Sequence, residues 1–208
     1  GSLKDSAKKL VFDEHTIKQF LEAAAKQNIW LAACTHSGED EIVLKAHKKI
    51  GGILLIAPRH IERGKHIANL SRAMGFTTQL RSEVPELQKE TVVYIADTMG
   101  EMGLWYSMVN IAFIGGSLVE KGGHNPVEAA QLETFILHGP FTHNAEEKYY
   151  QLNSLGVGVQ IENADILADE LKILRNKDPN KEFKRFKPFL QQNDTALITA
   201  LDTIRLAI

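Results

Sequence analysis

Short apolar runs alternate with amphipathic stretches along most of this chain. The strongest runs contain few internal polar residues, which is typical of strands that are buried on both faces. When such strands alternate with helices, they form a parallel sheet with helices on each side. We therefore expect an α/β fold, a Rossmann-like doubly wound parallel sheet. The expected strands are Ile29–Cys34 (IWLAAC), Ile53–Ala57 (ILLIA), Phe76–Leu80, Thr91–Ala96 (TVVYIA), Ile111–Ile114, Phe135–Leu137 and Val157–Ile161.

The segments between these runs show helical spacing of apolar residues and contain residues that are typical of helix ends. Asn144 and Glu147 have the spacing of a capping box, Gly75 fits a helix end, and Asp178–Asn180 predicts a turn. From about residue 163 onward no strong strand signal occurs, so we expect helices that close the sheet or reach toward another part. The expected helices are Glu14–Gln27, Glu39–Ile50, His60–Met74, Glu101–Ser107, Pro126–Leu132, Asn144–Leu155, Ala164–Asn176 and Glu182–Leu206.

The composition is that of a globular chain with one domain, or at most two. The 208 residues are 44% hydrophobic and carry a net charge of −2, which argues against nucleic acid as a main partner. Cys34 is the only cysteine, so no internal disulfide can form. No apolar run reaches the roughly 18 residues that a membrane span needs, and no signal peptide is visible. Gly1 and Ser2 resemble a cloning remnant, so we expect a piece of a longer protein.

Glycine-rich and histidine-rich segments follow four of the expected strands. Because the carboxyl ends of parallel strands meet at one edge of the sheet, these segments should gather there, where such folds bind ligands. Their coincidence at one edge matters more than any single motif. The segments are Thr35–Asp40, Pro58–His60, Asp97–Glu101 and Gly115–Glu128.

Two of these segments also match ordinary helix starts. Thr98–Glu101 and Asn125–Glu128 have capping-box spacing, with Pro126 at the favoured first position. A capping box does not require glycines, yet Gly115, Gly116, Gly122 and Gly123 precede the second one. We interpret them as allowing close approach of a ligand to main-chain N–H groups, where helix N-termini favour anions.

The charged residues of this edge suggest individual roles. Arg59 could clamp a phosphate or a carboxylate, or could form a surface salt bridge. Glu128 could accept hydrogen bonds from a ribose diol, and His124 and Lys121 could hold a substrate carboxylate or be structural. Cys34 ends a buried strand and is expected in the core.

Two further patterns are less specific. The histidines at positions 36, 60, 66, 124, 138 and 143 show no metal-ligand spacing, so no metal and no cofactor is expected. The segment Lys172–Lys187 holds seven Lys or Arg residues, which fits a solvated helix face or an anionic membrane surface.

Taken together, four segments resemble the Kdo transferases, which transfer 3-deoxy-D-manno-octulosonic acid (Kdo) from CMP-Kdo to the lipid A precursor of lipopolysaccharide. They are FIGGSLVEKGGHNPVEAA (Phe113–Ala130), APRH (Ala57–His60), DTMGE (Asp97–Glu101) and THSGEDE (Thr35–Glu41). The resemblance covers about residues 29–175 and implies one half of a two-domain GT-B glycosyltransferase. Residues 1–208 would then be the C-terminal, donor-binding domain. The N-terminal acceptor domain, with its membrane anchor and general base, would be absent, which leaves no catalytic residue in this chain.

The resemblance also implies which residues contact the donor. Two positions depart from the family, which usually has Ser at Cys34 and an acidic residue at Ser37. The implied CMP contacts are Pro58, Arg59, Met99, Gly100, Glu101, Asn125, Pro126, Val127 and Glu128. Looser candidates for sugar or loop contacts are Thr35, His36, Gly38, Glu39, Gly116, Ser117, Lys121, Gly122, Gly123 and His124.

The implied reaction is metal-independent and inverting at the anomeric carbon. Arg59 and the N–H groups of Gly100 and Glu101 would stabilise the departing CMP phosphate, and the missing domain would deprotonate the acceptor. The implied location is the cytoplasmic face of the bacterial inner membrane, with the fragment itself soluble and inactive alone. The alternatives are a UDP-sugar enzyme of the same fold, such as an epimerase, and a non-catalytic nucleotide-binding scaffold.

Overall fold

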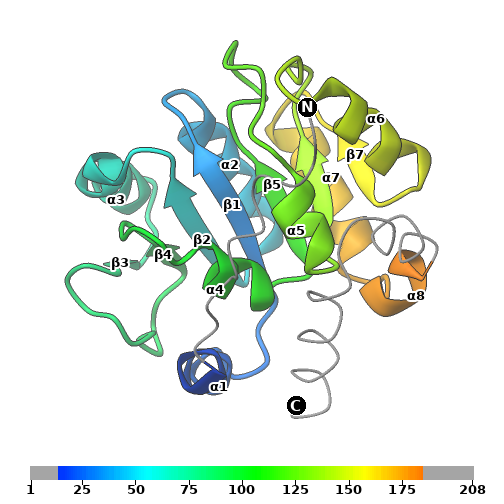
Figure 1. The fold of residues 1–208 in the computed structure, drawn as a ribbon. Coiled ribbons are helices and arrows are strands. Elements are labelled where there is room, and N and C mark those ends of the chain that lie inside the picture. Colours follow the sequence, from blue (N-terminus) through cyan, green and yellow to red (C-terminus); the bar gives the residue numbers. More distant parts are fainter. Residues whose placement is uncertain (1–13, 185–208) are drawn as a thin grey trace.

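The chain folds around one seven-stranded parallel sheet (Figure 1), seen here in a computed structural model that describes residues 14–184. The strands lie in the order β3-β4-β2-β1-β5-β6-β7, and every neighbouring pair is parallel. The doubly wound α/β fold predicted from the apolar runs is confirmed. The strands are β1 (Ile29–Thr35), β2 (Ile53–Pro58), β3 (Thr78–Leu80), β4 (Val93–Ile95), β5 (Ile111–Ile114), β6 (Phe135–His138) and β7 (Gly158–Gln160).

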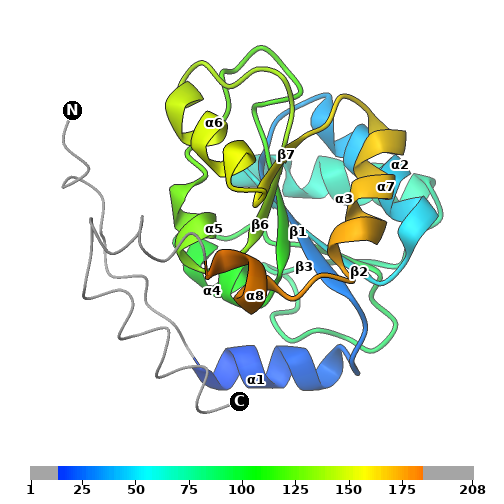
Figure 2. The same cartoon turned by 90° about the vertical axis from the view of Figure 1, so that its right-hand side faces the viewer.

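Helices cover both faces of the sheet, as Figure 2 shows edge-on. Helices α2, α3 and α7 lie on one face, where α2 packs against α7, and α4, α5 and α6 lie on the other. The helices are α1 (Glu14–Ala23), α2 (Glu39–Ile50), α3 (Gly64–Ala73), α4 (Met102–Ser107), α5 (Val127–Gln131), α6 (Glu146–Ser154), α7 (Ala164–Leu174) and α8 (Pro179–Phe183), with a 3-10 turn, η2 (Ile61–Arg63).

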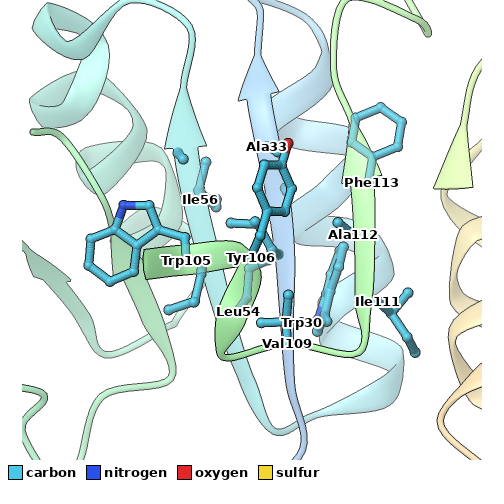
Figure 3. Packing of buried hydrophobic residues seen from close by; sticks show 14 of the residues in the cluster. Trp30, Ala33, Leu54, Ile56, Trp105, Tyr106, Val109, Ile111, Ala112 and Phe113 are labelled. Carbon is cyan, nitrogen blue, oxygen red and sulfur yellow. The ribbon is translucent and has the colours of Figure 1, made fainter. Parts of the chain in front are cut away.

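The central strands are apolar because both of their faces are covered. All six residues of β2 and all four of β5 are buried. On one face, Trp105 and Tyr106 of α4 lie over the sheet, and Tyr106 extends along β1 toward Ala33 (Figure 3). Helix α1 completes this side, since the ring of Phe20 packs edge-on against Tyr94 at 5.3 Å between centroids. Burial of these side chains supplies most of the stabilisation of the domain.

The predicted capping box of α6 is wrong. The helix begins at Glu146, and Asn144 makes no cap. Instead, the Asn144 side chain donates to the carbonyl oxygen of Lys121 (2.7 Å), and its main-chain N–H donates to Gly122 O (2.9 Å). Asn144 thus holds a loop that is distant in sequence rather than its own helix, an alternative that spacing alone does not reveal.

Several helix boundaries also differ from the predictions. The segment predicted as a helix from His60 opens with η2 before α3 begins, whereas Gly75 (φ 91°) ends that helix as predicted. The turn predicted at Asp178–Asn180 is wrong, because α8 starts at Pro179, a favoured first position. The expected helix Glu182–Leu206 lies outside the described residues beyond residue 184.

The order of strands reverses at β1. Strand β1 pairs with β2 on one side, with β4 and the edge strand β3 beyond it, and with β5 on the other side, with β6 and β7 beyond it. A crevice forms at such a switch point, beyond the carboxyl ends of the two strands, because the loops that follow these strands diverge. Figure 1 shows the segment between β5 and α5 extending beyond this edge.

We expect the free energy of unfolding to fall in mild acid because of His47. This side chain is fully buried in α2 and accepts a hydrogen bond from Trp30 Nε1 (3.2 Å), and burial lowers its pKa from 6.5 to about 4. In the unfolded chain His47 is therefore protonated below about pH 6.5, whereas in the folded chain it stays neutral down to about pH 4. Acid between these two values thus favours the unfolded state. From about pH 7.5 to about pH 5 this loss is about 2 kcal/mol.

Urea unfolding at the two pH values measures this contribution. His47→Gln removes the titrating group, so its pH dependence should be smaller than that of the unchanged chain. His66→Gln, at an exposed position of α3, is the control and should retain the full dependence. Equal pH dependence in the two variants would contradict the assignment.

Candidate functional site

The loops after β1, β2 and β5 meet at the switch point. The N–H of Gly115 donates to Ala33 O (2.8 Å), and the N–H of Arg59 donates to Thr35 O (3.0 Å). Strand β1 ends irregularly, with a register shift between Ala33 and Thr35 and a left-handed φ of 54° at Cys34. The structure therefore brings together three of the four segments that the sequence placed at this edge.

Glu39 lies between the first and the last of these loops. Its side chain is fully buried, and its carboxylate accepts four main-chain N–H bonds: from His36 and Gly116 at 2.8 Å each, from Leu118 at 2.9 Å and from Ser117 at 3.1 Å. Burial raises the pKa of Glu39, and the four N–H donors oppose that rise. Three N–H groups of the glycine-rich loop are thus occupied by the protein itself.

Internal packing also explains the glycines of this loop. A Cβ atom on Gly115 would collide with the main chain of Cys34, and Gly122 has a left-handed φ of 83° and lies against the Asn144 side chain. The earlier interpretation, that the glycines admit a ligand, is not needed for these positions. A glycine is required wherever another group lies too close for a Cβ atom, whether that group is a second segment of the protein or a ligand.

Two histidines meet across the switch point. His36 Nε2 and His124 Nε2 lie 2.8 Å apart, so one ring donates and the other accepts. Burial, and then the charges of His36, Arg59 and His60, lower the pKa of His124 to about 4. Burial also lowers the pKa of His36, and His60 and Lys121 add to that effect. The pair therefore stays neutral near pH 7, within a group of cationic side chains.

The two arginines beside this pair have different partners. Arg63 donates to Thr35 O (2.9 Å) and pairs with Asp40, which in turn accepts from the Thr35 hydroxyl (2.7 Å). Arg59 is exposed, and its guanidinium has no partner within residues 14–184. Arg63 thus braces the end of β1, whereas Arg59 is left available for an anion.

The segment after β4 is tied to the loop that precedes it. Arg81 donates to Glu101 through Nη2 (2.7 Å) and Nε (3.3 Å), and its guanidinium lies over the Trp105 ring. Burial opposes ionisation of Glu101, but the hydrogen bonds from Arg81 and Thr98 hold its pKa below the usual value. The capping box predicted from Thr98 and Glu101 is wrong, because Thr98 bonds to the carboxylate and no side chain caps α4.

This arrangement leaves Met99 and Gly100 as the exposed part of the segment. The Met99 side chain is 74% exposed, and Gly100 has a left-handed φ of 83°. Arg81 was missed at the sequence level, since it follows a weak strand and resembles any surface arginine. Its partner is 20 residues away in the chain, so spacing gives no signal.

The segment Asn125–Glu128 forms the remaining wall. Asn125 Oδ1 accepts from Val127 N (3.2 Å) and Lys148 Nζ (3.3 Å), so the predicted capping box is replaced by a local turn, and α5 begins at Val127 with Pro126 before it. The half-buried Glu128 carboxylate has no hydrogen-bond partner among the described residues.

Cys34 marks where these groups converge. Burial raises the pKa of its thiol to about 11, the positive charge of Arg59 opposes that rise, and the charges of Glu128 and Glu39 add to it. Cys34 is therefore close enough to Arg59 and Glu128 to feel both charges. Arg59 and Glu128 are the predicted donor contacts whose charged side chains have no partner among residues 14–184. Both therefore lie near the protonated thiol of Cys34 at the switch point.

A separate hollow of about 190 Å³ lies elsewhere. It contains Ile29 and Ile111, the first residues of β1 and β5, together with Trp30 and Arg175. It is therefore at the amino ends of the strands, away from the predicted site, and none of the predicted site residues lines it.

Residues 14–184 contain neither a cluster of metal ligands nor a helix that could span a membrane. No group of three or more His, Cys, Asp or Glu side chains in this range is arranged to hold a metal ion. No helix there combines the length and apolar character that a bilayer crossing requires.

The fold and the clustered charges define a doubly wound α/β domain with a candidate ligand site at its switch point. A 3-deoxy-D-manno-octulosonic acid transferase from Haemophilus influenzae is 35% identical over 185 residues, which are 85% of this chain and 43% of that protein. An enzyme of the same name from Rickettsia bellii is 30% identical over 98% of this chain and 51% of its own length. The chain is therefore a relative of the Kdo transferases, as its motifs indicated.

The chain spans about half the length of these curated relatives. A solved structure, the C-terminal CMP-Kdo binding domain of WaaA from Acinetobacter baumannii, matches with a TM-score of 0.67 at 23% identity. The match covers 92% of this chain and 98% of that one, so the two share one fold throughout. No family model matches the chain.

The position of the Arg59 guanidinium can be tested by titrating His124. Removing the positive charge in Arg59→Gln favours the imidazolium form, so we expect the pKa of His124 to rise from about 4 by roughly half a unit or more. NMR titration of the His124 Cε1–H signal, assigned with His124→Gln, measures the change. Arg72→Gln on α3 removes the same charge elsewhere and should leave the titration unchanged. An equal pKa in Arg59→Gln and the unchanged chain would place Arg59 away from the pair.

Proposed function

We propose that this chain is the donor-binding domain of a Kdo transferase and that its switch-point site binds CMP-Kdo. The observation that carries the proposal is the pair of free charged side chains, Arg59 and Glu128, at the switch point of a chain related to these enzymes. A guanidinium suits the single phosphate of the donor, and a carboxylate suits the ribose diol.

The charge distribution supports an anionic ligand. Arg81 forms an ion pair with Glu101 and offsets its charge, whereas the four N–H donors of Glu39 are neutral and stabilise its negative charge in place. Arg59 and Lys121 act electrostatically on the His36–His124 pair and so lie on its side of the domain. Arg59 and Lys121 therefore supply the positive charge that would attract a phosphate to this side of the domain.

The other predicted contacts have roles that follow from their positions. The exposed Met99 and Gly100 present main-chain groups after β4, and Asn125, Pro126 and Val127 form the wall next to Glu128. Pro58 ends β2 and directs Arg59 to the edge. We assign Glu39, Gly116, Ser117, Gly122 and Gly123 to loop structure and not to the donor-sugar contacts for which they were candidates.

The proposed chemistry needs charge stabilisation at the leaving group. As the bond from the anomeric carbon to the phosphate breaks, negative charge grows on CMP, and Arg59 and the N–H groups near Gly100 would stabilise it. The acceptor hydroxyl, which we propose belongs to a lipid A precursor, would lose its proton to a base outside residues 1–208. Transfer with inversion, and a site of action at the cytoplasmic face of the inner membrane, belong to the same proposal.

Titration with CMP tests the proposal. We expect saturable binding by calorimetry or by NMR, and we expect Arg59→Ala to weaken it by about 1–3 kcal/mol, the scale of a hydrogen bond to a charged group. Lys65→Ala removes one positive charge from an exposed position of α3 and should bind normally.

Competition with other nucleotides then separates the alternatives. A UDP-sugar enzyme would bind UDP in preference to CMP, whereas a Kdo transferase should prefer CMP. No binding to a folded sample at millimolar CMP would refute the proposed function. Preserved affinity in Arg59→Ala would remove Arg59 from the site.

A further inference from the structure

Glu39 accepts hydrogen bonds from main-chain N–H groups of two loops, the turn that leads into α2 and the glycine-rich loop after β5. Helix α2 is preceded by Gly38 without a side-chain cap, although Glu39 is its first residue. Oxygen Oε2 accepts from His36 and Gly116, and Oε1 accepts from Ser117 and Leu118. Burial of a carboxylate is costly, and four N–H bonds of 2.8–3.1 Å are the compensation that makes it tolerable.

The two loops lead directly to the two free charged side chains of the site. On one side, His36 follows Thr35, whose carbonyl oxygen accepts from the N–H of Arg59 (3.0 Å). On the other side, Gly123 N donates to Gly116 O (2.8 Å), and this fixes the segment that runs on to Glu128. Glu39 therefore joins the Arg59 wall to the Glu128 wall, alongside the hydrogen bond between His36 and His124.

The N–H groups of Gly116, Ser117 and Leu118 converge on one point, as in an anion-binding nest. Because Glu39 fills this nest, a ligand phosphate has no access to it and has to bind elsewhere on the edge. A carboxylate is required here, since all four partners are donors. A glutamine amide offers one accepting oxygen and turns its NH₂ group against N–H groups.

We propose that Glu39 is a positioning residue of the nucleotide site. Its carboxylate sets the separation of Arg59 and Glu128, and CMP affinity depends on it although it does not touch the ligand. This inference rests on the proposed function for its ligand, but the positioning itself can be measured without any nucleotide.

The first test compares two glutamates of the same helical turn. Glu41 has a side chain that is 57% exposed, and among residues 14–184 it pairs with Lys45 alone (2.8 Å). We expect Glu39→Gln to shift the NMR signals of the Gly116, Ser117 and Leu118 amides and to weaken CMP binding about tenfold or more. Glu41→Gln should change neither. A folded Glu39→Gln chain with unchanged amide signals and unchanged CMP affinity would overturn the proposal.

The second test uses chemical rescue, which a general loss of stability would not show. Glu39→Ala leaves a space beside four unpaired N–H groups, which acetate or formate can enter. Either anion should restore the loop amide signals and raise CMP affinity several-fold over chloride at equal ionic strength. In the unchanged chain and in Glu41→Ala, acetate should only compete with CMP. The absence of any difference between acetate and chloride in Glu39→Ala would count against a positioning carboxylate.

The two proposals fail in different ways. If the unchanged chain does not bind CMP, the proposed function is refuted, and the response of the loop amides to Glu39→Ala and acetate still decides whether Glu39 joins the loops. If CMP binds but substitution of Glu39 changes neither the loop amide signals nor the CMP affinity, the proposed function stands and the positioning role is refuted.

Discussion

The reversal of strand order at β1 is the constraint on which the site depends. Because β2 and β5 flank β1, the loops after these strands leave the sheet in different directions and open a space between them. Side chains from distant parts of the sequence approach each other around that space. Without the reversal, Arg59, Cys34 and Glu128 would not share one environment.

The distribution of ion pairs at this edge follows from the same geometry. Asp40 is paired with Arg63, Glu101 with Arg81, and Glu39 with four N–H groups. The two arginines offset the charges of Asp40 and Glu101, the four N–H groups stabilise the ionised Glu39, and each pairing also fixes a loop. The same interactions therefore hold the loops in place and engage carboxylates that could otherwise pair with Arg59, so they contribute both to stability and to the site.

The sequence predicts the sheet well because a strand that is buried on both faces requires a continuous run of apolar residues. The bounds of β5 and α2 match the prediction, and β1 and β2 differ from it by one residue at one end. Caps are predicted less well, since Asn144 and Thr98 have the right spacing but use their side chains on other partners. A local pattern cannot say whether a polar side chain will bond within its helix or across the fold.

In the candidate site, too, features set by neighbouring residues can be predicted, whereas contacts between residues far apart in the sequence cannot. The sequence places Arg59 and Glu128 at one edge because each directly follows a strand or opens a helix there. It does not show that Glu39 meets Gly116, which is 77 residues away, or that Arg81 meets Glu101, because these bonds depend on the tertiary arrangement of loops. Glycines are ambiguous for the same reason, since the close neighbour that excludes a Cβ atom at Gly115 is the protein's own backbone and not a ligand. The sequence pattern thus identifies the edge of the sheet at which the candidate binding residues lie. The pairing of charged side chains across that edge determines which of these residues remain free to bind a ligand.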